Sequence, residues 1–167
     1  MLTIRQAVPA DLPALVDIYN YAVRETTATF DLEEQSVADR QAWFASHQPA
    51  QYPLLVAEDD GVVLGYSGIL PYRVKPAYRH TVELSIYVHP AAQGQGIGKR
   101  LMEAIIEQAQ TIGYHVIISG ITGGNDVSFR LHEQFGFQEV GILREVGYKF
   151  DDWRDVHFYQ LTLPLAD

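Results

Sequence analysis

TVELSIYVHPAAQGQGIGKRLM, residues 81–102, reads as a strand, a glycine-rich turn and the start of a helix. The first eight residues alternate or combine β-branched, apolar and aromatic side chains, and His89-Pro90 ends the run. An amphipathic segment starts near Ile97, among three closely spaced glycines, Gly94, Gly96 and Gly98. Glycines at this spacing let backbone N–H groups approach an anion, and a helix adds partial positive charge at its N-terminus. The stretch therefore predicts a phosphate-binding turn.

Two common phosphate-binding motifs do not fit this turn. A P-loop requires a glycine where Gln93 stands and a hydroxyl residue where Arg100 stands. A dinucleotide-binding turn requires the spacing GxGxxG and a later acidic residue, whereas this turn reads GxGxG and the HVIISG after Tyr114 has no acid. The ligand therefore belongs to another class of phosphate compound.

Composition limits the classes of function further. The 167 residues suffice for one domain, 47% of them are apolar, and we expect a single domain over residues 1–167. A net charge of −9 offers no electrostatic basis for a nucleic-acid partner. The chain has no apolar run of membrane-spanning length and no basic-then-apolar leader, so we expect no membrane partner and a cytoplasmic protein. Cysteine is absent, which excludes disulfides, thiolate metal sites and an acyl-cysteine intermediate; we expect no metal.

The rest of the chain alternates between predicted strands and helices, which indicates an α/β domain. The strands are expected at residues 2–7, 53–58, 62–72, 81–88, 114–119, 139–147 and 155–163. The helices are expected after an N-cap at Asp11, from a capping box of Ser36 and Asp39 to about His47, over 97–112, and from Asn125 to Phe135. Residues 120–124 and 148–154 are expected to be loops, the second carrying Lys149 and Trp153.

Two loops leave alternatives open. Residues 26–30, TTATF, are either a connector with Phe30 in the core or a segment that contacts substrate. Residues 72–80, YRVKPAYRH, concentrate basic side chains in an acidic protein. They form either a solvated loop or a site for a small anion such as a carboxylate.

Two motifs resemble those of the GNAT superfamily of acetyl-CoA-dependent N-acyltransferases. Gln93-x-x-Gly96-x-Gly98 resembles its pyrophosphate-binding motif, and the helix capped by Asn125 and ending at Gly136-Phe137 resembles its second signature. The resemblance implies a central mixed, mostly antiparallel twisted sheet flanked by helices. It also implies a V-shaped split between two parallel strands, the one carrying Glu83 and the one starting at Tyr114.

The resemblance extends to the phosphinothricin and methionine sulfoximine or sulfone N-acetyltransferases. It rests on Thr-Val-Glu at 81–83, Tyr-Val-His-Pro at 87–90, Arg-Leu-His-Glu at 130–133 and the segment VGYKFDDWRD at 146–155. That subfamily implies direct transfer of acetyl from acetyl-CoA to the α-amine of a small amino-acid analogue, a homodimer and a role in detoxification. The alternatives are acetylation of a peptide or protein N-terminus or another amine, and a non-catalytic acyl-CoA-binding module.

The resemblance also assigns binding residues by position. The residues expected to bind acetyl-CoA are Tyr87, Val88, His89, Gln93, Gly94, Gln95, Gly96, Ile97, Gly98, Lys99, Asn125 and Ser128. The residues expected to bind the amine substrate are Phe30, Arg73, Lys75, Glu83, Ser85 and Tyr87.

Two residues are candidates for the chemistry of amine acetylation. The amine must lose a proton, and Glu83 is an acidic residue within a run that reads as buried, where burial would raise its pKa toward that of a general base. His132 occupies the helix position where many superfamily members carry a tyrosine acid. A histidine there permits an acidic, a basic or a structural role.

Overall fold

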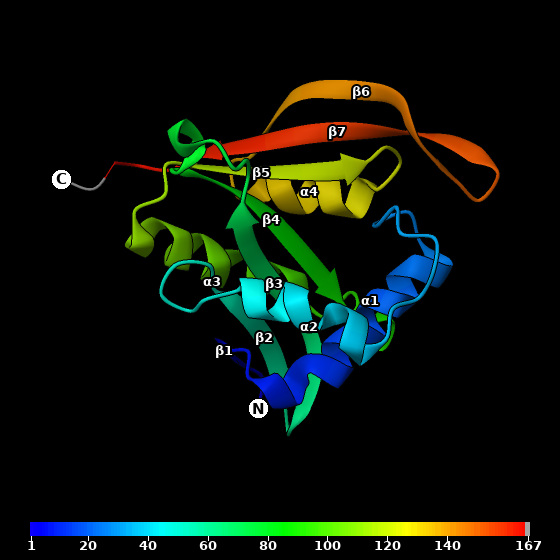
Figure 1. Ribbon diagram of the computed structural model, residues 1–167, viewed down its shortest axis with the longest axis vertical. Helices are drawn as coiled ribbons and strands as arrows, with labels where there is room; N and C mark the ends of the chain where they lie inside the picture. The colour runs from blue at the N-terminus through cyan, green and yellow to red at the C-terminus, as the bar shows by residue number, and fades with distance from the viewer. Residues whose placement is uncertain (166–167) are drawn as a thin grey trace.

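The computed structural model describes residues 1–165, and in them one seven-stranded sheet runs in the order β1-β2-β3-β4-β5-β7-β6 (Figure 1). The strands are β1 (Thr3–Gln6), β2 (Leu54–Asp59), β3 (Val62–Pro71), β4 (Thr81–Val88), β5 (Val116–Thr122), β6 (Gln138–Lys149) and β7 (Asp152–Thr162). All neighbouring strands are antiparallel except β4 and β5, which are parallel. The expected fold class is therefore confirmed.

Within the described residues, four α-helices pack on the two faces of this sheet (Figure 1). They are α1 (Leu12–Glu25), α2 (Val37–Ser46), α3 (Ile97–Ile112) and α4 (Asp126–Gln134). Side chains alternate between the faces of a strand, so Leu55 joins the core beneath α3 while Leu54 and Val56 join the core beneath α1. No helix within residues 1–165 has both the length and the apolar character needed to cross a membrane.

The parallel strands β4 and β5 stay together over a short distance only. Their pairing covers three positions, from Thr81 opposite Val116 to Glu83 opposite Ile118. Beyond Glu83 the strands diverge toward their C-terminal ends, and we call this opening the fork (Figure 1). Because ligands of parallel sheets bind at the C-terminal ends of strands, the fork is the natural place for a site.

Asp11 occupies the N-cap position of α1 as expected, but its side chain does not cap the helix. A 3₁₀ turn, Pro9–Asp11, leads into the helix, so Asp11 already has helical backbone angles and makes no capping bond to α1. Its carboxylate instead accepts a 2.8 Å bond from the N–H of Val8 and forms an ion pair at 2.7 Å with Arg5. The capping box at the start of α2 is confirmed, with Ser36 and Asp39 bonded reciprocally.

The C-terminal hairpin is longer than expected, and the loop predicted over 148–154 is wrong. Strands β6 and β7 continue to a two-residue turn at Phe150-Asp151, where both residues have a φ of 55°. Left-handed angles at both positions match the twist of a hairpin, but such turns usually contain a glycine after Asn or Asp. This turn has Phe before Asp and no glycine, so its sequence signal is weak. Strand β5 also extends through Gly120 to Thr122, into the loop predicted at 120–124.

Candidate active site

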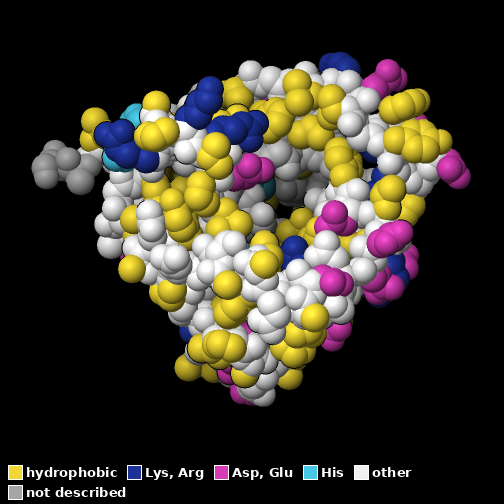
Figure 2. All heavy atoms as spheres, in the orientation of Figure 1, with side chains coloured by type: hydrophobic (Ala, Val, Ile, Leu, Met, Phe, Trp, Pro, Cys, Tyr) yellow, Lys and Arg dark blue, Asp and Glu magenta, His cyan; other side chains and the backbone are white. Residues whose placement is uncertain are grey.

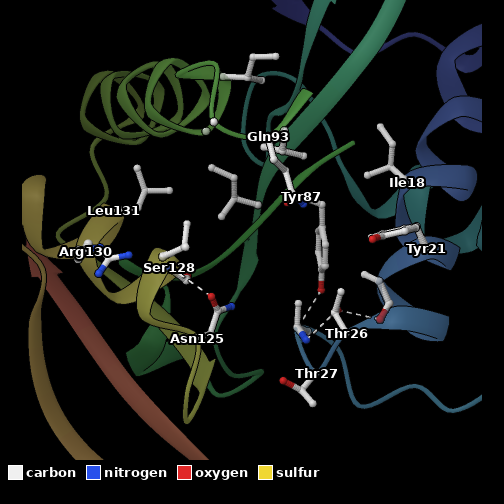
Figure 3. Close-up of a pocket in the computed structure, with 18 of the residues that line it drawn as sticks. Ile18, Tyr21, Thr26, Thr27, Tyr87, Gln93, Asn125, Ser128, Arg130 and Leu131 are labelled. Atoms are coloured by element: carbon white, nitrogen blue, oxygen red, sulfur yellow. Dashed lines mark hydrogen bonds between the residues drawn. The ribbon is translucent and has the colours of Figure 1, made fainter. Parts of the chain in front are cut away.

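A cleft of about 1240 Å³ opens at the fork. Five segments line it: the start of α3 with the turn before it, the end of β4, α4 with the turn before it, the end of α1 with the residues that follow, and the β6–β7 hairpin through Phe150 and Arg154. Figure 2 shows the surface hollowed in the middle of the molecule, and Figure 3 shows side chains from these segments around the opening. Every residue expected to bind acetyl-CoA lines the cleft except His89 and Gln95.

The start of α3 provides a cradle of backbone N–H groups. Gly96 is the N-cap, with a φ of 77°, and no side chain caps the first turn. The first-turn N–H groups of a helix have no partner within the helix, so they are available to an anion. The sites of Gly94 and Gly96 have no neighbouring atom within 4 Å of a Cβ, so their positive φ, rather than lack of space, requires glycine.

His89 and Gln95 do not line the cleft, and their side chains instead form hydrogen bonds to the turn that precedes α3. The Nδ1 atom of His89 accepts a 3.1 Å bond from the N–H of Ala91. The side-chain amide of Gln95 donates a 3.1 Å bond to the carbonyl of Ala91. Both side chains therefore stabilise the short 3₁₀ turn that precedes the cradle, Pro90–Ala92.

Helix α4 forms the opposite wall. The Asn125 side-chain oxygen accepts a 3.2 Å bond from the N–H of Ser128, which leaves its amide nitrogen as the free donor beside the cleft (Figure 3). Val127, Leu131 and Gln134 also line the cleft, as does Arg130, which the sequence reasoning missed. The helical periodicity of these positions was the available signal.

The cleft carries positive charge suited to phosphate. Lys99 lies in the first turn of α3, Arg130 on α4, and Arg154 on β7, and all three line the opening. Within residues 1–165 no group of three or more His, Cys, Asp or Glu side chains could hold a metal ion. The donor set therefore fits an anionic organic ligand held by N–H groups and cations.

Strand β4 presents its predicted residues on one face. Glu83, Ser85 and Tyr87 alternate with the buried Val82 and Leu84, so they share the opposite side of the strand. Tyr87 lines the cleft, and Glu83 stands where the fork begins. Glu83 is exposed, so the expectation of a buried side chain is wrong. The surrounding protein still removes enough water to raise its pKa, and the charge of Arg73 opposes that rise.

The basic loop places one of its two candidate cations near Glu83. Arg73 stacks on the ring of Tyr72, with its guanidinium carbon 4.3 Å from the ring centroid, and it lowers the pKa of Glu83 through its charge. Lys75 is exposed at the start of the 3₁₀ turn Pro76–Tyr78. The structure therefore associates Arg73, and not Lys75, with the fork.

His132 lies in the core, away from the cleft, with 2% of its surface exposed. Its Nδ1 atom is 2.7 Å from the carbonyl of Ser128, so Nδ1 carries the proton and donates it. Its Nε2 atom then accepts the 3.0 Å bond from the hydroxyl of Ser119 on β5. Burial lowers the pKa of His132. The imidazole is thus a neutral link between α4 and β5.

Phe30 is neither buried in the core nor part of the cleft lining. Its side chain is 36% exposed, and its ring packs over Gly147 of β6, where a Cβ would come within 2.6 Å of the Cζ atom. The residues before it, Thr26, Thr27 and Ala28, do line the cleft. Sequence analysis left residues 26–30 open between a connector and a segment that contacts substrate, because a loop has no periodicity that shows which residues face inward.

Comparison with known proteins places this geometry in context. Residues 15–137 match the model of the acetyltransferase (GNAT) family. The chain is 42% identical, over 97% of its length and 95% of the relative's, to the L-methionine sulfoximine/L-methionine sulfone acetyltransferase of Salmonella typhimurium.

Two solved structures are also similar. One is a GNAT superfamily phosphinothricin acetyltransferase from Sinorhizobium meliloti in complex with acetyl-CoA, at 36% identity and a TM-score of 0.93 over 97% of this chain and 88% of that one. The other is a ribosomal-protein-alanine N-acetyltransferase from Brucella melitensis, at 43% identity and a TM-score of 0.93 over 96% of this chain and 99% of that one.

Proposed function

The chain belongs to the GNAT family of acetyltransferases, and from that premise we propose that it acetylates the α-amine of a small L-amino acid. The proposed acceptors carry a tetrahedral polar group at the end of the side chain, as methionine sulfoximine, methionine sulfone and phosphinothricin do. The observation that carries the proposal is the uncapped start of α3, which opens onto a cleft at the fork of two parallel strands.

The residues of the cleft fit acetyl-CoA as the donor. The N–H groups at the start of α3 would hold the pyrophosphate, and Lys99 and Arg130 would balance its charge. The amide of Asn125 and the unpaired edge of β4 beyond Glu83 offer hydrogen bonds to the amide-bearing arm. Acetyl-CoA supplies an activated acetyl group as a thioester.

Glu83 is the proposed general base. An amine attacks a thioester only in its unprotonated form, and a carboxylate with a raised pKa can accept the proton directly or through one water. The amine nitrogen then bonds to the acetyl carbon while the bond from that carbon to sulfur breaks. The chain contains no cysteine that could carry the acetyl group, which supports direct transfer.

Arg73 is the proposed partner of the acceptor's α-carboxylate. Its charge lowers the pKa of Glu83 in the structure described. A carboxylate bound to Arg73 would neutralise that charge, so the pKa of Glu83 would rise further when the acceptor binds. The arrangement would thus strengthen the base at the moment when the amine arrives. The other proposed acceptor contacts are Ser85 and Tyr87, which share a face of β4 with Glu83; Phe30 and Lys75, expected from the sequence, lie outside the cleft lining.

The proposal assigns His132 a structural role. Both ring nitrogens already have partners, Ser128 and Ser119, and the ring is enclosed by aromatic side chains. A group that cannot contact the thioester cannot protonate the departing thiolate. We therefore propose that solvent protonates the departing thiolate.

A homodimer is part of the proposal. The β6–β7 hairpin projects from the body of the molecule, with β6 at the edge of the sheet (Figure 1). It exposes large apolar side chains, Leu143, Val146, Tyr148, Phe150 and Trp153. Such a patch on an edge strand favours pairing with a second copy. Light scattering after size-exclusion chromatography should give twice the mass of 18.8 kDa.

A second acceptor class is favoured by one comparison. The similar protein from Brucella melitensis is named for acetylation of a ribosomal-protein alanine. A peptide N-terminus would present the same amine to Glu83 but no α-carboxylate to Arg73. The basic side chain at the fork therefore supports the free amino acid as the acceptor.

Acetylation of the tetrahedral amino-acid analogues in the cytoplasm would amount to detoxification.

The decisive test is thiol release from acetyl-CoA with a panel of acceptors: the three tetrahedral analogues, plain methionine, a polyamine and a short peptide. We expect turnover with the analogues and none with the peptide. Glu83→Gln should lower kcat/KM by about 10²- to 10⁴-fold, the usual contribution of a general base. Glu103→Gln, on the exposed side of α3, is the control. Unchanged turnover in Glu83→Gln would remove Glu83 from the mechanism.

A further inference from the structure

The fork is the weakest lateral joint in the sheet. Strand β4 pairs with β3 over seven positions, and β5 pairs with β7 over seven, but β4 pairs with β5 over three. This short ladder cannot set the distance between the two halves of the sheet at the open end of the fork. Groups outside the ladder must therefore hold the halves at a defined separation.

Residues 26–31, which we call the strap, bridge that open end. Three successive carbonyls of the strap accept bonds from three different strands. Thr122 of β5 donates its hydroxyl to the carbonyl of Thr27 at 2.6 Å, and Lys149 of β6 donates its ammonium to the carbonyl of Thr29 at 2.9 Å. Between them, Tyr87 of β4 reaches the carbonyl of Ala28 at 3.4 Å. The strap is thus tied to both sides of the fork.

The far end of the strap is anchored as well. The hydroxyl of Tyr19 on α1 contacts the hydroxyl of Thr29 at 2.9 Å and donates to the carboxylate of Asp31. The ring of Phe30 packs over Gly147, which leaves no room for a side chain there. The strap is therefore fixed along its whole length and not only at its middle.

Lys149 occupies a position that a lysine rarely takes. It is 3% exposed, and among residues 1–165 it forms no ion pair. Its hydrogen bond goes to the strap, and its ammonium lies 5.1 Å from the ring centroid of Phe150. Burial of an amine is unfavourable without a compensating interaction. For Lys149, the hydrogen bond to the carbonyl of Thr29 in the strap is that interaction.

The strap forms the end of the cleft that lies away from the phosphate cradle. Thr26 and Thr27 lie across the pocket from Gln93, and the ring of Tyr87 extends between them (Figure 3). A donor molecule with its phosphates at the α3 cradle would bring its acyl end toward the strap. The separation of the strap from β4 and β5 then limits the acyl group that fits.

We propose that Thr122 and Lys149 are positioning residues that set the size of the acyl group transferred, by holding the strap across the open end of the fork. The inference rests on the proposed function, since it requires an acyl-CoA in the cleft. Neither side chain needs to touch the acyl group. Each acts through the backbone of Thr27 or Thr29.

The test compares acetyl-, propionyl- and butyryl-CoA with one acceptor in the wild type, Thr122→Val and Lys149→Met. Both substitutions preserve shape and remove the donor. The measured quantity is the ratio of kcat/KM for butyryl-CoA to that for acetyl-CoA, which is independent of the fraction of folded enzyme. One methylene in a pocket is worth about 10- to 200-fold, so we expect the ratio to rise by about fivefold or more.

Two controls make the result specific. Thr122→Ser keeps the hydroxyl and should retain the wild-type ratio, and Thr162→Val, at an exposed position on β7, should leave the ratio unchanged. If Lys149→Met does not fold, Thr122→Val decides alone. An unchanged ratio in the active variants would overturn the inference while leaving the proposed function intact. A wild type without turnover on any acyl-CoA would overturn both.

Discussion

His47 should make the stability of the protein depend on pH between neutrality and pH 5. It follows α2, its Nδ1 atom lies 3.0 Å from the carbonyl of Trp43, and its ring packs edge-on against that of Trp43. Burial, together with the charge of Arg40, lowers the pKa of His47 from 6.5 to about 4, although the hydrogen bond that Nδ1 donates to the carbonyl of Trp43 opposes this shift. The folded protein therefore prefers the neutral ring.

The magnitude follows from the difference between the two pKa values. Above pH 6.5 both folded and unfolded chains are neutral at this site, and His47 has no effect. As the pH falls below 6.5, His47 becomes protonated in the unfolded chain but stays neutral in the folded chain, so the free energy of unfolding decreases. The loss amounts to about 2 kcal/mol between pH 7.5 and pH 5, and to about 3 kcal/mol once the pH is below 4.

The assay is urea denaturation at pH 7.5 and pH 5 for the wild type and His47→Gln. The variant should lose about 2 kcal/mol less than the wild type over this interval, because glutamine does not titrate. His80→Gln, at an exposed site, is the control and should behave as the wild type does. Equal losses in the wild type and His47→Gln would refute the claim that folding holds this ring neutral.

Two further predictions follow from the packing around the site. Gly147→Ala should lower the free energy of unfolding by about 1 to 3 kcal/mol, measured by denaturation, because its Cβ would displace the ring of Phe30; an unchanged midpoint would show that the ring swings out freely. Ser119→Ala should cost about 1 to 3 kcal/mol by leaving the buried Nε2 atom of His132 unpaired, with kcat/KM per folded enzyme unchanged. Ser46→Ala, at an exposed position, is its control, and a selective loss of turnover in Ser119→Ala would return His132 to the chemistry.

Local sequence signals predicted most of the elements. The glycine spacing and the amphipathic pattern after it located α3, which ends at Ile112 before Gly113 as expected. The capping box of Ser36 and Asp39 located α2. The errors occurred where tertiary contacts override local preference. The Phe150-Asp151 turn adopts left-handed angles without glycine, because the long β6–β7 ladder outweighs the local strain.

The candidate site divides in the same way. Residues that act through a local backbone conformation, such as Gly96 and Asn125, were predictable, because that conformation depends on residues only a few positions away in the chain. Residues that act through distant partners were not. Lys149 was expected in a loop, and nothing in the sequence shows that it is buried against the carbonyl of Thr29, 120 positions away.

By itself, the sequence determined the family and located the glycine turn before α3 and the acidic residue of β4 on which the proposed function rests, since each depends on residue types at short spacing. Only the tertiary structure decided which of these groups lie close to one another. It showed Glu83 exposed where the fork begins, and it enclosed His132 between Ser119 and Ser128. The physical reason is that exposure and hydrogen-bond partners are set by segments far apart in the chain, which only the packed sheet brings together.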